Sequence, residues 1–324
     1  MPLVAAIIVN FRTGPMTVEA LASLMPSGAE PYEIRAFVVD NDSGDGSADF
    51  IEAAIEKNGW GGWASVIRSP VNGGFSAGNN LVMKSVKPDF FLLLNSDAQL
   101  RPGALARLVS CMANRRDVGL VGPRLEDDNG DPQHSSFRYH TPISEFMRAA
   151  STGPIDKILE RHKVPLDVSE DVIEADWISF ACVLIRRDVV DAIGLLDEGY
   201  FLYFDDIDYC RRAKVAGWKA VTDPSARVFH LCSGSTKLNT SMSKRARLPK
   251  YHYASRARYF AKYYGGRCGV FCANAMWLVG RTISLARQLA GKRRKHVCAR
   301  EGLDNWTFFW NPMQQFQPEQ KDGR

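Results

Sequence analysis

The run Phe90-Phe91-Leu92-Leu93-Leu94, which ends in Asn95-Ser96-Asp97, decides the fold of this chain of 324 residues. Five consecutive apolar residues predict a strand that is buried on both faces, as in a parallel sheet covered by helices. The polar residues that follow are types that an apolar core does not favour. In open α/β sheets ligands bind beyond the carboxyl ends of the strands, so the segment also predicts a site at this strand end.

Three earlier apolar runs extend this pattern, and two of them end in polar residues. Val4–Val9 is followed by Asn10, and Ala36–Val39 is followed by Asp40-Asn41-Asp42, while Ala64–Ile67 is a third expected strand. Segments with helical spacing separate the runs, so we expect an α/β fold with a mostly parallel central sheet and helices on both faces. Turns and helix N-caps also use Asn, Asp and Ser. Three such clusters on one sheet edge favour a binding site.

The segments between and after these strands are less regular. Asn72–Gly78 is rich in glycine and predicts a turn, with a short helix over Asn80–Val86. Arg101–Asn114 predicts a helix with Pro102 at its first position. His134–Glu170 shows little periodicity and is expected to be a loop with short helices.

Charge divides the chain into two parts. Lys237–Arg300 contains 16 Lys or Arg and no Asp or Glu, so the rest of the chain carries a net charge of −11 against a total of +5. We therefore expect an α/β domain over residues 1–236 and a basic, mostly helical region over 237–324. The seven Cys include no CxxC pair, which argues against a disulfide framework or zinc site and favours a reducing, cytosolic compartment. We expect no signal peptide, and no apolar stretch reaches the roughly 18 residues of a spanning helix.

An acidic cluster follows the aromatic run Tyr200–Phe204. Asp205-Asp206-Ile207-Asp208 opens a predicted helix that continues through Arg211-Arg212 and ends at Gly217. Compensation of the helix dipole accounts for Asp208 and the arginines. It accounts less well for two adjacent carboxylates beside an apolar wall. Apolar surroundings and a second carboxylate raise the pKa of a carboxyl group, which produces a base that works near neutral pH.

Taken in order, these segments resemble the family 2 glycosyltransferases, which are inverting enzymes of the GT-A fold, and within them the bacterial rhamnosyltransferase-like branch. The resemblance covers residues 3–265. The segments that carry it are Ile8–Phe11, Val39–Ser43, Asp45–Ser47, Asn72–Asn80, Leu94–Ala98, Leu184–Arg187, Leu196–Glu198, Tyr203–Asp208, His230 and Ser233–Ser235.

The resemblance implies a divalent cation, Mg or Mn, that bridges the diphosphate of the sugar donor. Asp97 lies where the family carries the last residue of its DxD-type motif, and Asn95 replaces the first. Asp97 is therefore expected to bind the cation, an oxygen-ligand role suited to these metals. His230 aligns with a family histidine that completes metal or phosphate binding, although a lone His is more often a packed or solvated residue.

The resemblance also implies which residues bind the donor. Asp40 and Asp42 would contact the nucleoside, and Gly73-Gly74 would let the backbone approach the nucleotide closely. Asn79 and Asn80 would hold the loop or the sugar, or else cap a helix. The expected donor-binding residues are Asn10, Phe11, Asp40, Asp42, Gly73, Gly74, Asn79, Asn95 and Ser96.

For the reaction, the resemblance implies that Asp206 is the general base that deprotonates an acceptor hydroxyl, with Asp205 beside it. Attack then inverts the anomeric carbon without a covalent intermediate. The donor implied by this branch is dTDP-rhamnose, with UDP- and GDP-sugars left open, and the acceptor is a cell-surface polysaccharide or glycolipid. Two departures concern the sugar pocket: Asp205 replaces a Glu, and Phe180 stands where the family has Gly.

The basic region allows more than one partner. Gly269–Leu289 followed by Lys292-Arg293-Arg294-Lys295 is typical of an interfacial helix with a polybasic flank, which would place the protein at the inner face of the cell membrane. Packing on the catalytic domain or on a second subunit is the alternative, and nucleic acid is disfavoured because no such motif is present.

Two other functions stay open from the sequence. A sugar-nucleotide-binding protein without turnover would keep the same residues. A dinucleotide-binding oxidoreductase would also combine a strand, a glycine-rich turn and a helix. Here that turn follows the third strand rather than the first, and GxGxxG is absent.

Overall fold

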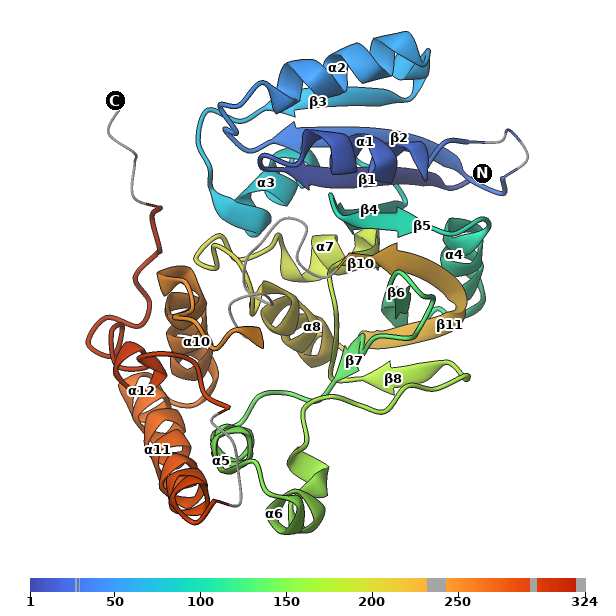
Figure 1. The fold of residues 1–324 in the computed structure, drawn as a ribbon. Helices are drawn as coiled ribbons and strands as arrows, with labels where there is room; N and C mark the ends of the chain where they lie inside the picture. Colours follow the sequence, from blue (N-terminus) through green and yellow to red (C-terminus); the bar gives the residue numbers. More distant parts are fainter. Residues whose placement is uncertain (27, 29, 232–242, 292–295, 319–324) are drawn as a thin grey trace.

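The computed structural model describes residues 1–318 apart from 27, 29, 232–242 and 292–295 (Figure 1). Ser233–Ser235 and Lys292–Lys295, which the sequence singled out, lie outside the described residues. The strands are β1 Leu3–Asn10, β2 Glu33–Asp40, β3 Ala64–Arg68, β4 Phe90–Asn95, β5 Ala98–Leu100, β6 Val118–Glu126, β7 Ser136–Phe137, β8 Ile173–Ala175, β9 Trp177–Ile178, β10 Cys182–Arg186 and β11 Lys219–His230. The helices are α1 Gly14–Ala22, α2 Ser47–Lys57, α3 Gly74–Met83, α4 Ala104–Asn114, α5 Pro142–Ala150, α6 Gly153–Ile158, α7 Arg187–Ile193, α8 Asp205–Val215, α10 Lys250–Tyr263, α11 Arg267–Leu289 and α12 Glu301–Asp304, with 3-10 turns at Trp60–Gly62 and Glu160–His162.

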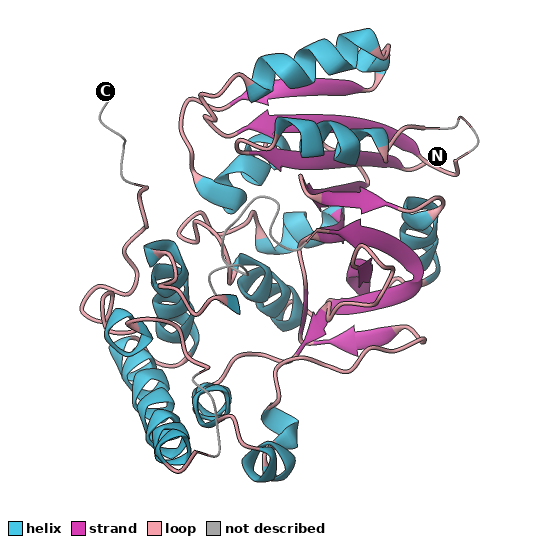
Figure 2. Ribbon diagram, viewed as in Figure 1, coloured by secondary structure: helices cyan, strands magenta, loops and turns pink. Residues whose placement is uncertain are grey.

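One large sheet runs through the molecule in the order β3-β2-β1-β4-β10-β6-β11-β5, with β8 beside β11. The first four strands are parallel, whereas β10 is antiparallel to both of its neighbours. β6 and β11 form a further parallel pair, and β7 pairs with β9 in a small separate sheet. Helices cover both faces of the main sheet (Figure 2). The expected α/β class is confirmed.

Alternation along β1 shows why helices are needed on both faces. Val4, Ala6 and Ile8 point into one buried cluster, which residues of α1, α2 and α4 complete. Ala5 and Ile7 point into a second cluster, which residues of α3, α8, α10 and α11 complete. Successive side chains of a strand point to opposite faces, so an unbroken apolar run must be covered twice.

The glycine-rich segment differs from the prediction. The structure continues α3 back to Gly74, so most of the expected turn is helix and the helix ends at Met83 rather than at Val86. Glycine disfavours helix by about 1 kcal/mol relative to alanine, which made a turn the better local prediction. A tertiary contact outweighs this preference, because the Phe75 N–H donates to the Phe201 carbonyl at 2.8 Å. Similarly, α4 begins at Ala104 after Gly103, so Pro102 lies outside the helix.

The basic C-terminal region is helical, as expected, and it shares a core with the sheet. Ala257, Phe260, Val270 and Ala273 belong to the same buried cluster as residues of β10. In Figure 1, α10, α11 and α12 lie side by side, with α5 against α11. The domain boundary after residue 236 stays a prediction. Among the described residues one helix, α11, is long and apolar enough to cross a membrane by length and composition.

Candidate active site

The polar ends of three parallel strands meet at one edge of the sheet. Asn10 pairs in register with Asp40 across β1 and β2, and Val9 pairs with Asn95 across β1 and β4. The three residues at which the apolar runs of the sequence end therefore occupy neighbouring positions. This is the edge at which ligands bind in open α/β sheets.

Asn10 is the centre of a buried hydrogen-bond network. Its Nδ2 donates to Asp40 Oδ1 at 2.7 Å and to the hydroxyls of Ser43 and Ser47 at 3.1 and 2.9 Å. Its Oδ1 accepts from the Thr13 N–H and hydroxyl and from the Thr17 hydroxyl. Both atoms of the amide are thus used within the protein. Asn10 therefore holds Asp40 in place, and its role in binding a donor stays a prediction.

The predicted residues around this network differ in exposure. Asp40 is buried and its Oδ2 accepts from the Ser43 N–H at 3.2 Å. Asp42 is exposed and adopts a left-handed φ of 57°, so its carboxylate is available to a ligand. Phe11 is half-buried with the Arg12 guanidinium 5.0 Å from its ring centre. Arg12 is a further exposed cation at this edge, and it was not among the predicted site residues. Its position directly after Asn10-Phe11 is the signal in the sequence that could have identified it.

Gly73 and Gly74 allow a close approach between two segments of the protein itself. A side chain at Gly74, where φ is +81°, would put its Cβ 2.0 Å from the Phe201 carbonyl oxygen. At Gly73 a Cβ would meet Ala77. Asn72 supports the turn because its Oδ1 accepts from Asn41 Nδ2 at 3.0 Å and from the Gly74 N–H at 3.1 Å. The glycines bring the start of α3 against the aromatic run that precedes α8.

Asn79 and Asn80 lie inside α3, so they do not cap it. Asn79 is buried and its Nδ2 donates to the Phe75 carbonyl at 2.9 Å. Asn80 is bonded to the loop before α8: its Nδ2 donates to the Leu196 carbonyl and to Glu198 Oε1, both at 2.9 Å, and its Oδ1 accepts from the Leu196 N–H. Asn80 therefore holds a loop, which is one of the roles that the sequence allowed.

The two predicted metal ligands lie next to each other although 133 residues separate them. The distance from His230 Nε2 to Asp97 Oδ1 is 3.6 Å. The antiparallel pairing of β11 with β5 creates this contact, since it sets His230 opposite Ala98, and the Leu231 N–H donates to the Asp97 carbonyl at 3.0 Å. Gln133 Nε2 donates to the His230 carbonyl at 2.9 Å. No sequence signal pointed to Gln133.

This pair fits a divalent cation. A carboxylate oxygen and an imidazole nitrogen so close together can share one ion, since each lies about 2.0–2.3 Å from a metal that it binds. Among the described residues no group of three or more His, Cys, Asp or Glu side chains could hold a metal. Such a two-donor site leaves coordination positions for phosphate oxygens and water, as is usual for Mg²⁺ in phosphate chemistry. Asn95 and Ser96 precede the pair, and Ser96 Oγ accepts from the Thr13 hydroxyl at 3.0 Å.

The backbone before Asp205 is strained. Tyr203 and Phe204 both adopt left-handed φ values, 67° and 66°, which are unusual for aromatic residues. Each such residue costs of order 1–3 kcal/mol and persists only where the surrounding structure imposes it. Here the close contact of Gly74 and Phe75 with Phe201 fixes the segment from one side. The two left-handed residues lead directly into α8, which starts with Asp205 and Asp206.

Burial dominates the titration of these two carboxyls. It raises the pKa of Asp205 to about 7, and the neighbouring Asp208 charge acts in the same direction. The pKa of Asp206 is raised well above its usual range by burial and then by Asp205. Backbone N–H groups of Ile207 and Phe180 lower the Asp206 pKa, but by less than burial raises it. Both shifts favour the protonated form, so these carboxyls exchange protons at a higher pH than an exposed aspartate does.

Asp208, in the same helical turn, has the opposite environment. Its carboxylate lies 2.9 Å from Arg212 Nε and 2.6 Å from Lys262 Nζ, and it accepts from the Tyr263 hydroxyl at 2.7 Å. Lys262 and Tyr263 come from α10, so the basic region supports the first turn of α8. The sequence does not reveal this role, because only the fold brings α10 to α8.

Backbone contacts link the segments that carry Asp97 and Asp206. The Asn95 N–H, two residues before Asp97, donates to the Ala181 carbonyl at 2.9 Å. Phe180, the residue before Ala181, is the one whose N–H acts on Asp206. The Phe180 ring is 3% exposed and packs edge-on against Tyr209 with centroids 6.1 Å apart, so it is part of the core and does not stand in an open pocket.

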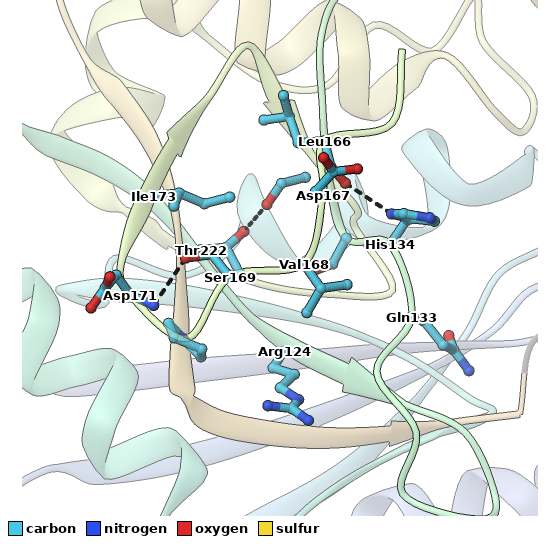
Figure 3. Close-up of a pocket in the computed structure, with 13 residues that line it drawn as sticks. Arg124, Gln133, His134, Leu166, Asp167, Val168, Ser169, Asp171, Ile173 and Thr222 are labelled. Carbon is cyan, nitrogen blue, oxygen red and sulfur yellow. Dashed lines mark hydrogen bonds between the residues drawn. The ribbon is translucent and has the colours of Figure 1, made fainter. Parts of the chain in front are cut away.

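Two cavities lie away from this edge. One of about 20 Å³, room for about one water molecule, lies between the strand that carries Thr222 and the loop that carries Leu166 (Figure 3). Gln133, which donates to the His230 carbonyl, is one of the residues that line this cavity. A larger one of about 650 Å³ lies between α5 and Trp177. Neither cavity is lined by a predicted site residue.

Comparison with known proteins gives the family. The family model described as "Glycosyltransferase like family 2" matches residues 2–248. An N-acetylglucosaminyl-diphospho-decaprenol L-rhamnosyltransferase of Mycobacterium tuberculosis is 29% identical over 252 residues, which are 73% of this chain and 77% of that protein. Rhamnosyltransferase WbbL of Escherichia coli is 24% identical, and the alignment covers 58% of this chain and 70% of that protein.

Among solved structures, a mannosyltransferase of Pyrobaculum calidifontis in complex with GDP-Man and Mn²⁺ has a similar fold. Its TM-score is 0.58 at 15% identity, and the alignment covers 90% of this chain and 76% of that one. At this identity the likeness concerns the fold, and it confirms the expected GT-A architecture.

Proposed function

Because this chain belongs to glycosyltransferase family 2, we propose that it transfers a sugar from a nucleoside diphosphate to a hydroxyl, with inversion at the anomeric carbon. The oxidoreductase that the sequence left open is set aside by the family match. The names of two relatives favour rhamnose as the sugar, and one of them specifies L-rhamnose. The carrier dTDP is the one that the resemblance of the sequence implies. One of these names includes a decaprenol diphosphate and favours a lipid-linked glycan as the acceptor.

One observation supports the proposal above the others: the Asp97–His230 pair and the Asp205–Asp206 pair lie at the same sheet edge. The donor diphosphate would lie beside Asp97 and His230, and the nucleoside beside Asp40 and the exposed Asp42. A divalent cation held by Asp97 and His230 would stabilise the negative charge of the departing diphosphate.

Asp206 then acts on the acceptor. Its carboxylate takes the proton of the acceptor hydroxyl while the oxygen attacks the anomeric carbon from the side opposite the diphosphate. The new C–O bond forms as the bond between carbon and phosphate oxygen breaks, and the nucleoside diphosphate leaves with the electron pair. Asp205, buried beside it, raises the Asp206 pKa and so strengthens the base.

We infer that the protein works in the cytoplasm. Six described cysteines are free, and such thiols persist in a reducing compartment.

Release of nucleoside diphosphate and the anomeric configuration of the product test the proposal. The purified chain is incubated with Mn²⁺ or Mg²⁺, a lipid-linked N-acetylglucosamine acceptor and dTDP-, UDP- or GDP-sugars, and the product is analysed by NMR. We expect acceptor-dependent release with one donor class and an inverted product. Asp191→Asn, an exposed carboxylate of α7, is the matched control for Asp206→Asn. A retained configuration, or full activity of Asp206→Asn, would overturn the assignment.

A further inference from the structure

One face of α11 is open to solvent and, beyond Arg267 at its first position, carries no charge. Its large apolar residues recur at helical spacing and are each at least 42% exposed; they are Phe271, Leu278, Val279, Leu285 and Leu289. The exposed positions between them are Cys268, Cys272, Thr282 and Ala286. We call these nine residues the open face. Contiguous exposed apolar surface of this length marks an interaction site in a folded protein.

The opposite face of α11 is fixed to the fold. A side chain at Gly280 would collide with the Phe146 carbonyl of α5. The buried Asn274 accepts from Arg256 Nη1 at 2.7 Å and donates to the Asn305 carbonyl at 2.9 Å. Arg256 in turn forms a buried ion pair with Glu145 at 3.0 Å. A placement of α11 across a bilayer would break this network, so the helix can offer only its open face.

Aromatic and cationic side chains continue the open face at the N-terminal end of α11. The Phe271 and Trp306 rings are 6.0 Å apart, and the exposed Trp310 lies with its ring centre 5.8 Å from the Arg267 guanidinium. Tryptophan and arginine are residues that favour the headgroup level of a bilayer, since one part is apolar and the other polar.

Charge identifies the partner. Within α11 there is no Asp or Glu, the exposed Arg267 lies at its N-terminal end, and the half-buried Arg281 and Arg287 flank the open face. Two copies of the chain that met face to face here would bring like charges together. An anionic surface is attracted instead, by roughly 1 kcal/mol for each basic residue close to it.

We propose that the open face of α11 docks on an anionic phospholipid bilayer. The helix lies flat in the interface with its apolar side chains among the acyl chains and its arginines at the headgroups. Trp306 and Trp310 anchor the N-terminal end. The proposal concerns a surface remote from Asp206 and does not depend on the transfer reaction.

Vesicle binding tests it directly. The full chain is sedimented with vesicles of phosphatidylglycerol and phosphatidylcholine, and with vesicles of phosphatidylcholine alone. We expect binding to the anionic vesicles that weakens at 0.5 M NaCl (roughly a 4 Å Debye length) and is weaker for the neutral ones. The double variant Leu278→Glu, Leu285→Glu should bind about 100-fold more weakly, since it removes two exposed leucines that the bilayer would bury and adds negative charge.

The control is Val215→Glu, at a position of α8 that is 87% exposed and is not part of the open face. It should bind vesicles as the unsubstituted chain does, and thermal unfolding should show that all variants fold. Absence of binding to anionic vesicles would refute the proposal. So would light scattering that shows a dimer without lipid which the double variant dissociates, because the open face would then be covered by a second copy.

Discussion

At the ends of β1 and β2 the buried polar side chains bond to one another, whereas α8 begins with the buried Asp205 and the half-buried Asp206. Asn10 uses both atoms of its amide within the protein. Asp205 and Asp206 have pKa values raised by burial, and they follow two residues with left-handed φ. In the proposed function, the donor side is therefore held rigidly by hydrogen bonds, and the acceptor side carries the carboxyls of raised pKa.

This difference implies opposite consequences of substitution. A change on the donor side removes hydrogen bonds that stabilise the fold and should lower the free energy of unfolding. A change at the carboxyl pair removes a base but also relieves the cost of burying charge, so activity should fall without loss of stability. The predictions below separate the two sides in this way.

The largest expected effect is that of Asp206→Asn. We expect transfer to fall by about 10³-fold, since general base catalysis contributes factors of this order. Isothermal titration should give a donor Kd within about twofold of the unsubstituted chain, because the amide keeps the shape of the carboxyl. Asp191→Asn should behave as the unsubstituted chain in both assays. A parallel loss of donor affinity would place Asp206 on the donor side instead.

Asn10→Ala should mainly affect stability. It leaves Asp40 and several buried hydroxyls without their partner, which we expect to lower the free energy of unfolding by about 2–4 kcal/mol in urea titrations. Asn58→Ala is the control, since this exposed amide makes one bond to the Ala54 carbonyl. If the two substitutions cost equally little, the network around Asn10 does not stabilise the edge.

Asp97→Asn should weaken cation-dependent donor binding. We expect the Kd for nucleoside diphosphate in Mn²⁺ to rise by about 10–100-fold, the usual effect of perturbing a metal site. Without divalent cation the two proteins should bind the nucleotide alike. An affinity that is independent of Mn²⁺ in both proteins would contradict the metal assignment.

The smallest effect concerns pH and stability. The Asp205 pKa is about 7 in the folded chain and near 3.8 without its environment, so the folded state binds more protons between these values. The free energy of unfolding should therefore fall as pH rises from about 4 to 7. Asp205→Asn should reduce this slope, with Asp206 supplying the rest, and stabilise the chain at pH 8 by about 1–3 kcal/mol. Asp49→Asn, at an exposed carboxylate, should keep the slope. A flat profile for the unsubstituted chain would show that the pair is not buried as described.

The strands and their polar ends could be predicted because both signals are local. Apolar runs that stop at Asn10, Asp40 and Asn95 define the strands, and parallel pairing then brings those ends together. The start of α3 could not be predicted, because Gly74 is helical only through its approach to Phe201, far along the chain.

The residues that hold the site residues in place could not be predicted from the sequence either. Gln133 holds His230 across 97 positions. Lys262 reaches Asp208 from α10, and in the sequence it was one more basic residue of a charged region. Such side chains have roles that depend only on where the fold carries them.

A crystal soaked with Mn²⁺ and nucleoside diphosphate gives the most direct test of a single cleft between Asp97 and Asp206. The anomalous signal of manganese locates the ion without reference to any assumed ligand. It is expected between the Asp97 carboxylate and the His230 imidazole, with the diphosphate beside it and the Asp206 carboxylate facing the same space. A manganese peak elsewhere, or a nucleotide on a face that Asp206 does not reach, would contradict it.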